Sequence, residues 1–256
     1  MNIHINKELF DFIMASTKSY KFVIGSKMYG IDDEKSDTDY LIIYHPFMNQ
    51  LLNPFSNIHQ LQYKDLDSNI DYNLVDLITF IKNLVSGDST INYELINNSQ
   101  LVGTDLEFLY DLKESFKTFN IAKSYLGFAK RDVNHFSRRT THKDRISGLL
   151  HIERSYKIAE YIMGINNSNL DDIYSYLKEV KRVNLDDTKI SFYKKIIDDL
   201  RTNLTSMHNE NKLVKYLDVE LQTLISNKLL EITKVSNEII PMNMFFFHNE
   251  NIEFKY

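Results

Sequence analysis

The chain contains no cysteine and has only 7 glycines and 3 prolines among its 256 residues. Without thiols there can be no disulfide framework and no thiolate metal site, so any bound metal must have oxygen or imidazole ligands. Hard cations such as Mg²⁺ are then the default. Because glycine and proline are scarce and charged residues make up 25%, the composition indicates long helices rather than loops, repeats or disorder.

A run of 18 apolar residues is also absent, and the first residues, Met1 to His4, lack the basic and apolar regions of a signal peptide. We therefore expect a soluble protein that has no membrane partner and stays in the cytoplasm of a bacterium or of a phage-infected host. Heavy use of asparagine, isoleucine and lysine fits an AT-rich genome, such as many phages have. The net charge of −5 provides no general attraction for nucleic acid.

Hydrophobic patterning predicts a helix, three strands and a second helix in the first part of the chain, at residues 7–14, 20–24, 40–44, 70–75 and 77–85. Pro46 should end the second strand. Asp76 stands where the N-cap of the second helix is expected, and Gly87 stands where that helix should end.

The pattern is helical from about Asp105 nearly to Glu238, with breaks expected near Gly127, residues 164–169 and residues 183–187. The aromatic stretch at 241–256 is too apolar for a free tail, so we expect it to pack on the body. These patterns predict an α+β fold, in which a small sheet with flanking helices (residues 1–118) is followed by a helical domain (residues 119–256).

The loop between the first two predicted strands carries the most informative residues. Gly25 allows the backbone to turn sharply and approach a phosphate, whose oxygens the Ser26 hydroxyl and nearby N–H groups can bind. Asp37 and Asp39 lie two residues apart at the start of a strand, so their side chains leave the same face. Such neighbouring carboxylates repel each other and favour a divalent cation, and Asp71 on the next strand can add a third carboxylate.

An alternative interpretation is that these residues form an ordinary turn, loop acids and the end of a strand. A lone Asp-x-Asp is weak in a chain with 35 acidic residues. The combination is more informative: a strand, Gly-Ser, ten residues, Asp-x-Asp opening a second strand, and an aspartate on the third. This combination favours the functional interpretation.

Gly25-Ser26, ten residues and Asp37-Thr38-Asp39 together resemble the signature of the polymerase-beta nucleotidyltransferase superfamily. The segment from Gly25 to Gly30, with Lys27 where arginine or histidine is usual, is similar to the predicted nucleotidyltransferases associated with RNA ligases in phages and bacteria. Residues 77–95 resemble that family's helix-glycine-helix segment, although Asp88 stands where asparagine is usual. Residues 125–130 and 151–164 resemble its later motifs, so the resemblance covers roughly residues 20–165.

The resemblance implies a catalytic site with two Mg²⁺ ions, or Mn²⁺ as an alternative, held by Asp37, Asp39 and Asp71. Asp37 and Asp39 would bind both ions or the nucleotide-side ion. Asp71 would bind the nucleophile-side ion and accept the proton. The substrate would be a nucleoside triphosphate, with ATP favoured, and Gly25, Ser26, Lys27 and Tyr29 would contribute to its binding.

Residues 121–157 carry nine basic side chains against three acidic ones, with phenylalanines and histidines interleaved. This segment could bind a triphosphate or an RNA backbone, or it could be an ordinary solvated helix face. His151 and Arg154 are three residues apart and so share one side of a helix. The family resemblance implies that this side of the helix faces the nucleotide. Arg154 is therefore the leading candidate for a residue that clamps a phosphate, and His151 and Lys130 are further nucleotide-binding candidates.

Three functions compete. The leading one is transfer of a nucleoside monophosphate from a nucleoside triphosphate to a hydroxyl acceptor, with RNA favoured, as in RNA repair or modification. A second is adenylylation of a protein partner, as antitoxin-like members of the superfamily perform, but those members are commonly shorter. A third is a catalytically inactive RNA-binding adaptor, which the presence of all three carboxylates argues against. The sequence carries no signal for the number of subunits.

Overall fold

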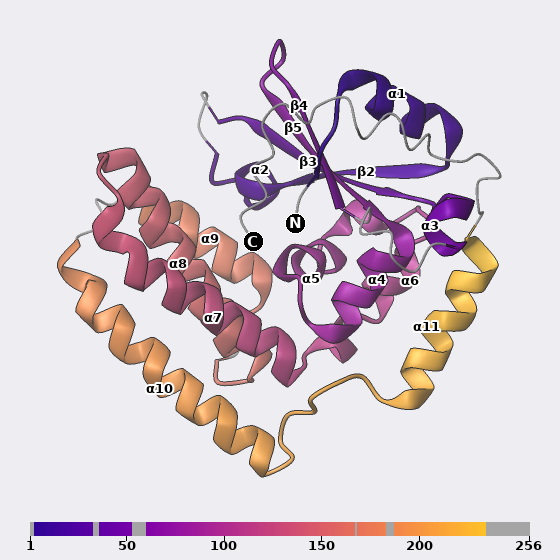
Figure 1. Ribbon diagram of the computed structural model, residues 1–256. Helices are drawn as coiled ribbons and strands as arrows, with labels where there is room; N and C mark the ends of the chain where they lie inside the picture. Colours follow the sequence, from indigo (N-terminus) through magenta and orange to yellow (C-terminus); the bar gives the residue numbers. More distant parts are fainter. Residues whose placement is uncertain (1–2, 33–35, 53–59, 167, 183–186, 234–256) are drawn as a thin grey trace, which may run out of the picture. The chain divides into compact units, whose positions relative to one another are not determined.

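The computed structural model describes residues 3–32, 36–52, 60–166, 168–182 and 187–233 (Figure 1). They form two compact units. The sheet unit comprises the described parts of residues 1–25, 37–81 and 228–256, and the helical unit those of residues 26–36 and 82–227. The aromatic stretch at 241–256 lies outside the described residues. No helix in the described part of the chain combines the length and apolarity that a membrane crossing requires.

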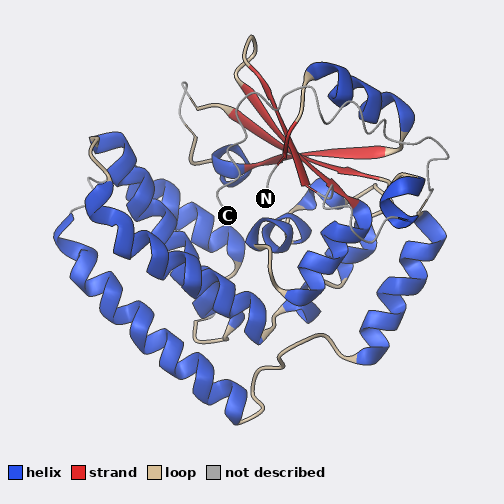
Figure 2. Ribbon diagram, in the orientation of Figure 1, coloured by secondary structure: helices blue, strands red, loops and turns tan. Residues whose placement is uncertain are grey.

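A mixed sheet of five strands forms the centre of the sheet unit, in the order β1-β4-β5-β3-β2 (Figure 2). β1 pairs with β4 and β3 with β5 in parallel, whereas β2 pairs with β3 and β4 with β5 in antiparallel fashion. The strands are β1 Ile3–His4, β2 Ser19–Ile24, β3 Thr38–Tyr44, β4 Gln60–Asp65 and β5 Ile70–Asp76. The three predicted strands are confirmed as β2, β3 and β5.

The sequence patterns did not predict β1 and β4. β1 has only two residues, and β4 buries only Leu61, so neither has enough apolar residues for the alternation to stand out. The order helix, strand, strand, strand, helix is therefore wrong as a description of the first part of the chain. Two short helices, α2 Gly25–Tyr29 and α3 Met48–Leu52, complete it.

One face of the sheet is covered by α1 Lys7–Ser16, which confirms the first predicted helix (Figure 1). Leu9 and Ile13 of α1 pack in one core cluster with Ile42, Leu61 and Leu74 of the strands. Neighbouring residues in a strand point to opposite faces, so Asp39 and Leu41, on either side of Tyr40, point to the face away from α1.

The helix α4 Leu77–Ser86 follows β5 directly and begins and ends as predicted. Asp76 accepts a hydrogen bond from the Thr79 N–H at 3.0 Å, which confirms its capping role. Gly87 has φ +77°, and the Asp88 N–H donates to the Asn83 carbonyl at 2.9 Å, as expected where a left-handed residue ends a helix.

Helices make up the second unit and more than half of the residues that the structure describes, which confirms the α+β class with dominant helix. Within this unit α7 packs against α8 and α10, and α8 packs against α9. The α-helices that follow α4 are α5 Thr90–Ile96, α6 Glu107–Asp111, α7 Phe119–His135, α8 His142–Ile162, α9 Leu170–Arg182, α10 Ile190–Asn209 and α11 Val219–Ile232. The residues of α11 from Lys228 onward are assigned to the sheet unit. Short 3₁₀ turns lie at Ser99–Leu101, Lys113–Phe116, Phe136–Arg138 and Asp187–Lys189.

The break expected near Gly127 is wrong, because α7 continues through that residue. A helix-interior glycine costs only about 1 kcal/mol relative to alanine, which the packing of α7 against its neighbours offsets. The break after Gly164 is confirmed by its φ of +65°. Near the third break, α9 ends at Arg182 and α10 begins at Ile190, and residues 183–186 lie outside the described part.

The two units do not divide at the expected boundary between residues 118 and 119. Tyr93 and Glu94 of α5 lie against Tyr125 of α7, with the two tyrosine rings 6.1 Å apart. Residues 90–118 therefore pack with the helices that follow them. Packing of this kind links segments that are separate in sequence, so composition alone does not reveal it.

Candidate active site

Two of the predicted carboxylates lie opposite each other on neighbouring strands. Asp39 of β3 and Asp71 of β5 are paired in the parallel register. Neighbouring strands lie about 4.8 Å apart, and paired residues point to the same face. Asp37 directly precedes β3, two residues before Asp39, so the strand alternation places it on that face as well. The predicted aspartates thus lie on one face of the sheet, at one end of the β3–β5 pair.

Gly25 lies against the Asp39 carboxylate. Its φ is +69°, and a Cβ built on it would stand 2.6 Å from Oδ2 of Asp39. Only glycine fits here, because a side chain would both strain the backbone and collide with the carboxylate. Within the sheet unit, Gly25 therefore positions a carboxylate, a role that the sequence interpretation did not include.

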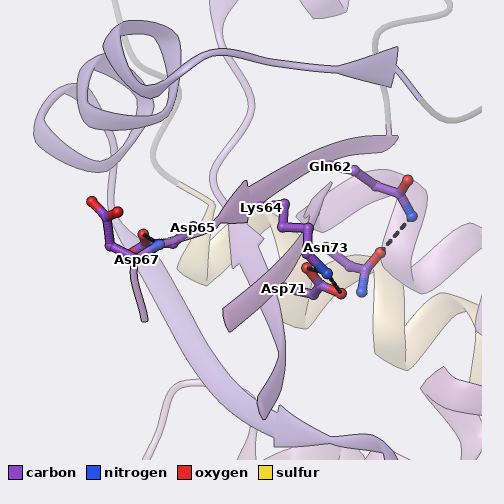
Figure 3. Close-up of polar contacts among 6 residues, drawn as sticks. All are labelled: Gln62, Lys64, Asp65, Asp67, Asp71 and Asn73. Carbon is purple, nitrogen blue, oxygen red and sulfur yellow. Dashed lines mark hydrogen bonds and ion pairs between the residues drawn. The ribbon is translucent and has the colours of Figure 1, made fainter. Parts of the chain in front are cut away.

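A lysine that was not among the predicted site residues pairs with Asp71. Lys64 of β4 is opposite Asp71 in the antiparallel register, and its Nζ lies 3.0 Å from Oδ1 and 3.1 Å from Oδ2 (Figure 3). The hydrogen bond that Lys64 donates to Asp71 raises the pKa of Lys64, and the negative charge of Asp71 raises it further. The charges of Asp37 and Asp39 add to this to a smaller extent. All three aspartates therefore act on one ammonium group.

If the sequence had been interpreted as a hairpin of β4 and β5, Lys64 would have been predicted to lie opposite Asp71. Residues 65–69 read Asp-Leu-Asp-Ser-Asn, a cluster of turn-forming residues directly before the predicted strand at 70–75. The next row on the same face holds Gln62 and Asn73, whose side chains are hydrogen-bonded from Nε2 to Oδ1 at 2.9 Å (Figure 3). The face that carries the aspartates thus remains polar for a second row.

The carboxylate chemistry of this face fits a divalent cation, although the side chains are not gathered around one point. No group of three or more acidic or histidine side chains within the described ranges is arranged to hold a metal ion. Asp71 Oδ1 is shielded from solvent and makes no well-directed hydrogen bond, although the Lys64 ammonium lies within ion-pair distance. Carboxylate oxygens with lone pairs of this kind are what Mg²⁺ and Mn²⁺ prefer.

Two predicted nucleotide-binding residues contact each other in the helical unit. Tyr29, the last residue of α2, is buried. The guanidinium of Arg154, on α8, lies 4.6 Å from the Tyr29 ring, and the ring of Tyr174, on α9, lies 4.8 Å from it. Arg154 Nε lies 3.9 Å from Glu94 Oε1, and the Glu94 side chain is fully buried. Glu94 also accepts hydrogen bonds from Tyr125 at 2.8 Å and Tyr174 at 3.2 Å.

This group, which we call the Glu94 cluster (Tyr29, Glu94, Tyr125, Arg154 and Tyr174), changes the interpretation of Arg154. The sequence interpretation placed its guanidinium on a triphosphate. In the structure the side chain is only 17% exposed and lies beside Glu94. Its contact with the Tyr29 ring holds the last residue of α2 against α8 within the helical unit.

The other candidates of the helical unit are not members of the Glu94 cluster. Lys130 on α7 is exposed and forms an ion pair with Asp198 on α10 at 3.2 Å. His151 is exposed on α8, one turn before Arg154; partial desolvation, and then the positive charge of Arg154, lower the pKa of its imidazole. Ser26 and Lys27 are half-buried in α2.

The basic segment covers most of α7 and of α8. Near the end of α7, Arg139 and Arg131 each lie 3.7 Å from Asp132, which is mostly buried. The interleaved aromatic residues pack under guanidinium groups: Arg131 lies 4.6 Å from the Phe128 ring and Arg145 5.4 Å from the Phe136 ring. Such contacts hold arginines in place while their N–H groups remain donors for anions.

A solved structure, a nucleotidyltransferase-like protein from Exiguobacterium sibiricum 255-15, is similar at 14% identity and a TM-score of 0.26, over 76% of this chain and 70% of that one. No curated protein matches the sequence. The family model described as "RNA repair pathway DNA polymerase beta family" matches residues 1–239, which is most of the chain. The chain therefore belongs to the RNA repair pathway DNA polymerase beta family.

Proposed function

We propose that this protein transfers a nucleoside monophosphate from a nucleoside triphosphate, with ATP favoured, to a hydroxyl group of RNA, with release of pyrophosphate. The observation that supports this most directly is the register that places Asp39 opposite Asp71, with Gly25 closed against Asp39. Asp37, Asp39 and Asp71 would hold two Mg²⁺ or Mn²⁺ ions. When bound, these ions would activate the attacking hydroxyl group and neutralise the charge of the phosphates.

The residues of the sheet unit would have distinct tasks in this reaction. Asp37 and Asp39 would hold the nucleotide-side ion, and Asp71 would hold the nucleophile-side ion and accept the proton of the attacking hydroxyl. Gly25 keeps the Asp39 carboxylate in one position, because any larger residue would displace it. Positioning and charge neutralisation are the main means by which proteins accelerate phosphoryl transfer.

Ser26 and Lys27 would bind the triphosphate through the hydroxyl and the ammonium, and His151 and Lys130 are further candidates for nucleotide contact. The Glu94 cluster supports the end of this segment, since Tyr29 packs between Arg154 and Tyr174. We propose that Arg154 acts on nucleotide affinity chiefly by holding Tyr29. The arginines at the ends of α7 and α8 would bind the RNA backbone.

The function is tested by incubating the full-length protein with each α-labelled nucleoside triphosphate, Mg²⁺ and bulk RNA. Labelled RNA is the expected product, and its yield should fall steeply as salt rises, since phosphate contacts are screened. Label on a protein instead would favour adenylylation of a partner. RNA binding with no transfer of any nucleotide would favour the inactive adaptor and contradict our proposal.

Replacing Arg154 with alanine is expected to raise KM for the nucleotide by about tenfold or more, with a smaller fall in kcat. The reason is that Tyr29 loses the guanidinium that packs on its ring. The measurement is the rate of transfer across nucleotide concentrations. A matched control is Lys157→Ala, which removes a cation one turn further along α8 whose ring contacts are with Tyr156 and Tyr176.

A second variant separates the two roles of Arg154. Glu94→Gln leaves the guanidinium in place but removes the charge that faces it. If Arg154 acts by positioning, this variant should also raise KM; if Arg154 binds the phosphate directly, KM should stay near the parent value. An unchanged KM in Arg154→Ala would exclude both roles.

A further inference from the structure

The Lys64 ammonium forms an ion pair with the Asp71 carboxylate, at oxygens that a metal ion would also use. Its Nζ lies within 3.1 Å of both carboxylate oxygens, on the face that carries Asp39 (Figure 3). The lysine side chain is 47% exposed, so its ammonium can move into solvent when its partner changes. The pair spans two adjacent strands, and the antiparallel register, not a flexible loop, determines its position.

An ammonium and a divalent cation compete for these oxygens. A metal bound to Asp71 at about 2.1 Å would use the lone pairs that now face Nζ, and the two positive charges would repel each other strongly at such a distance. The arrangement of the acidic side chains in the metal-free structure agrees with such competition at Asp71. Within the described ranges no three acidic side chains surround one point, and Asp71 is directed to Lys64.

We propose that Lys64 is an internal counter-cation for Asp71, which neutralises the acidic row in the metal-free protein and is displaced when a divalent ion binds Asp71. This inference rests on the proposed function, because it assumes that Asp71 is a metal ligand. It adds a regulatory property: the protein stays stable without metal, and occupancy of the nucleophile-side position requires enough metal to displace the lysine. In the metal-free protein, Lys64 reduces the repulsion among the three carboxylates.

The test uses Mn²⁺ as the probe on the full-length protein without nucleotide. Lys64→Met is expected to bind Mn²⁺ about three- to tenfold more tightly than the parent in calorimetry, because one ion pair no longer has to break and one like charge is gone. Thermal unfolding in EDTA should show a lower melting temperature for Lys64→Met than for the parent, and added Mn²⁺ should raise it by more.

Two variants serve as controls. Lys64→Arg keeps a cation beside Asp71 and should resemble the parent. Lys21→Met removes the same charge from the opposite face of the sheet, where Lys21 lies 3.8 Å from the Tyr40 ring, and should leave Mn²⁺ affinity unchanged.

The outcomes separate this inference from the proposed function. Equal or weaker Mn²⁺ binding by Lys64→Met would overturn the counter-cation role, while measurable binding by the parent would leave the metal site intact. If neither protein binds Mn²⁺, the proposed metal site is wrong, and the displacement of Lys64 falls with it.

Discussion

Replacing Asp39 with asparagine is expected to lower nucleotidyl transfer by about a thousandfold or more, while the fold stays intact or becomes slightly more stable. Asp39 lies opposite Asp71 and against Gly25, so an amide of the same shape can occupy the position without a clash. The amide cannot supply the negative charge that a divalent ion requires, which removes several kcal/mol of transition-state stabilisation. It also removes one of the neighbouring negative charges from the metal-free protein.

The measurement combines transfer rates with thermal unfolding of the parent and the variant. Asp67→Asn is a matched control, because Asp67 is an exposed residue of the β4–β5 turn and the change in charge is the same. This control should retain activity. Turnover near the parent rate in Asp39→Asn would refute the carboxylate mechanism, and unfolding of the variant would indicate a structural role for Asp39.

Replacing Glu94 with alanine is expected to lower the free energy of unfolding by about 3–5 kcal/mol. The fully buried carboxylate faces Arg154 and accepts hydrogen bonds from Tyr125 and Tyr174. Its removal leaves a mostly buried guanidinium without its counter-charge and takes one acceptor from the Tyr174 hydroxyl, while the Tyr125 hydroxyl keeps the Thr90 carbonyl at 3.1 Å. The loss is larger than that of an ordinary exposed ion pair, which contributes about 1 kcal/mol at most.

Urea unfolding of the parent, Glu94→Ala and Glu94→Gln measures this effect. The glutamine variant keeps an acceptor of similar shape and should lose less stability than the alanine variant. Glu179→Ala, at an exposed position of α9, is the control for loss of a glutamate from the helical unit and should change stability by less than about 0.5 kcal/mol. A loss below about 1 kcal/mol in Glu94→Ala would show that the cluster does not stabilise the fold.

Local sequence patterns were sufficient for several elements of the fold. The strands β2, β3 and β5 have continuous apolar or alternating residues, and their limits are marked by Gly25 and by the Asp76 cap. Patterns failed where the signal was short or where packing outweighed local preference. β1 and β4 bury too few residues to be recognised, and the glycine within α7 did not end the helix.

The sequence by itself determined the family and the α+β class, and it predicted the aspartates of the candidate site, because these depend on residue types at fixed spacing along the chain. Only the tertiary structure decided that Lys64 pairs with Asp71 and that Arg154 faces Glu94, which lies 60 positions earlier. Strand register and helix packing bring these side chains together. The physical reason is that a charge selects its partner by distance and burial in space, and neither quantity is encoded in the spacing of a motif.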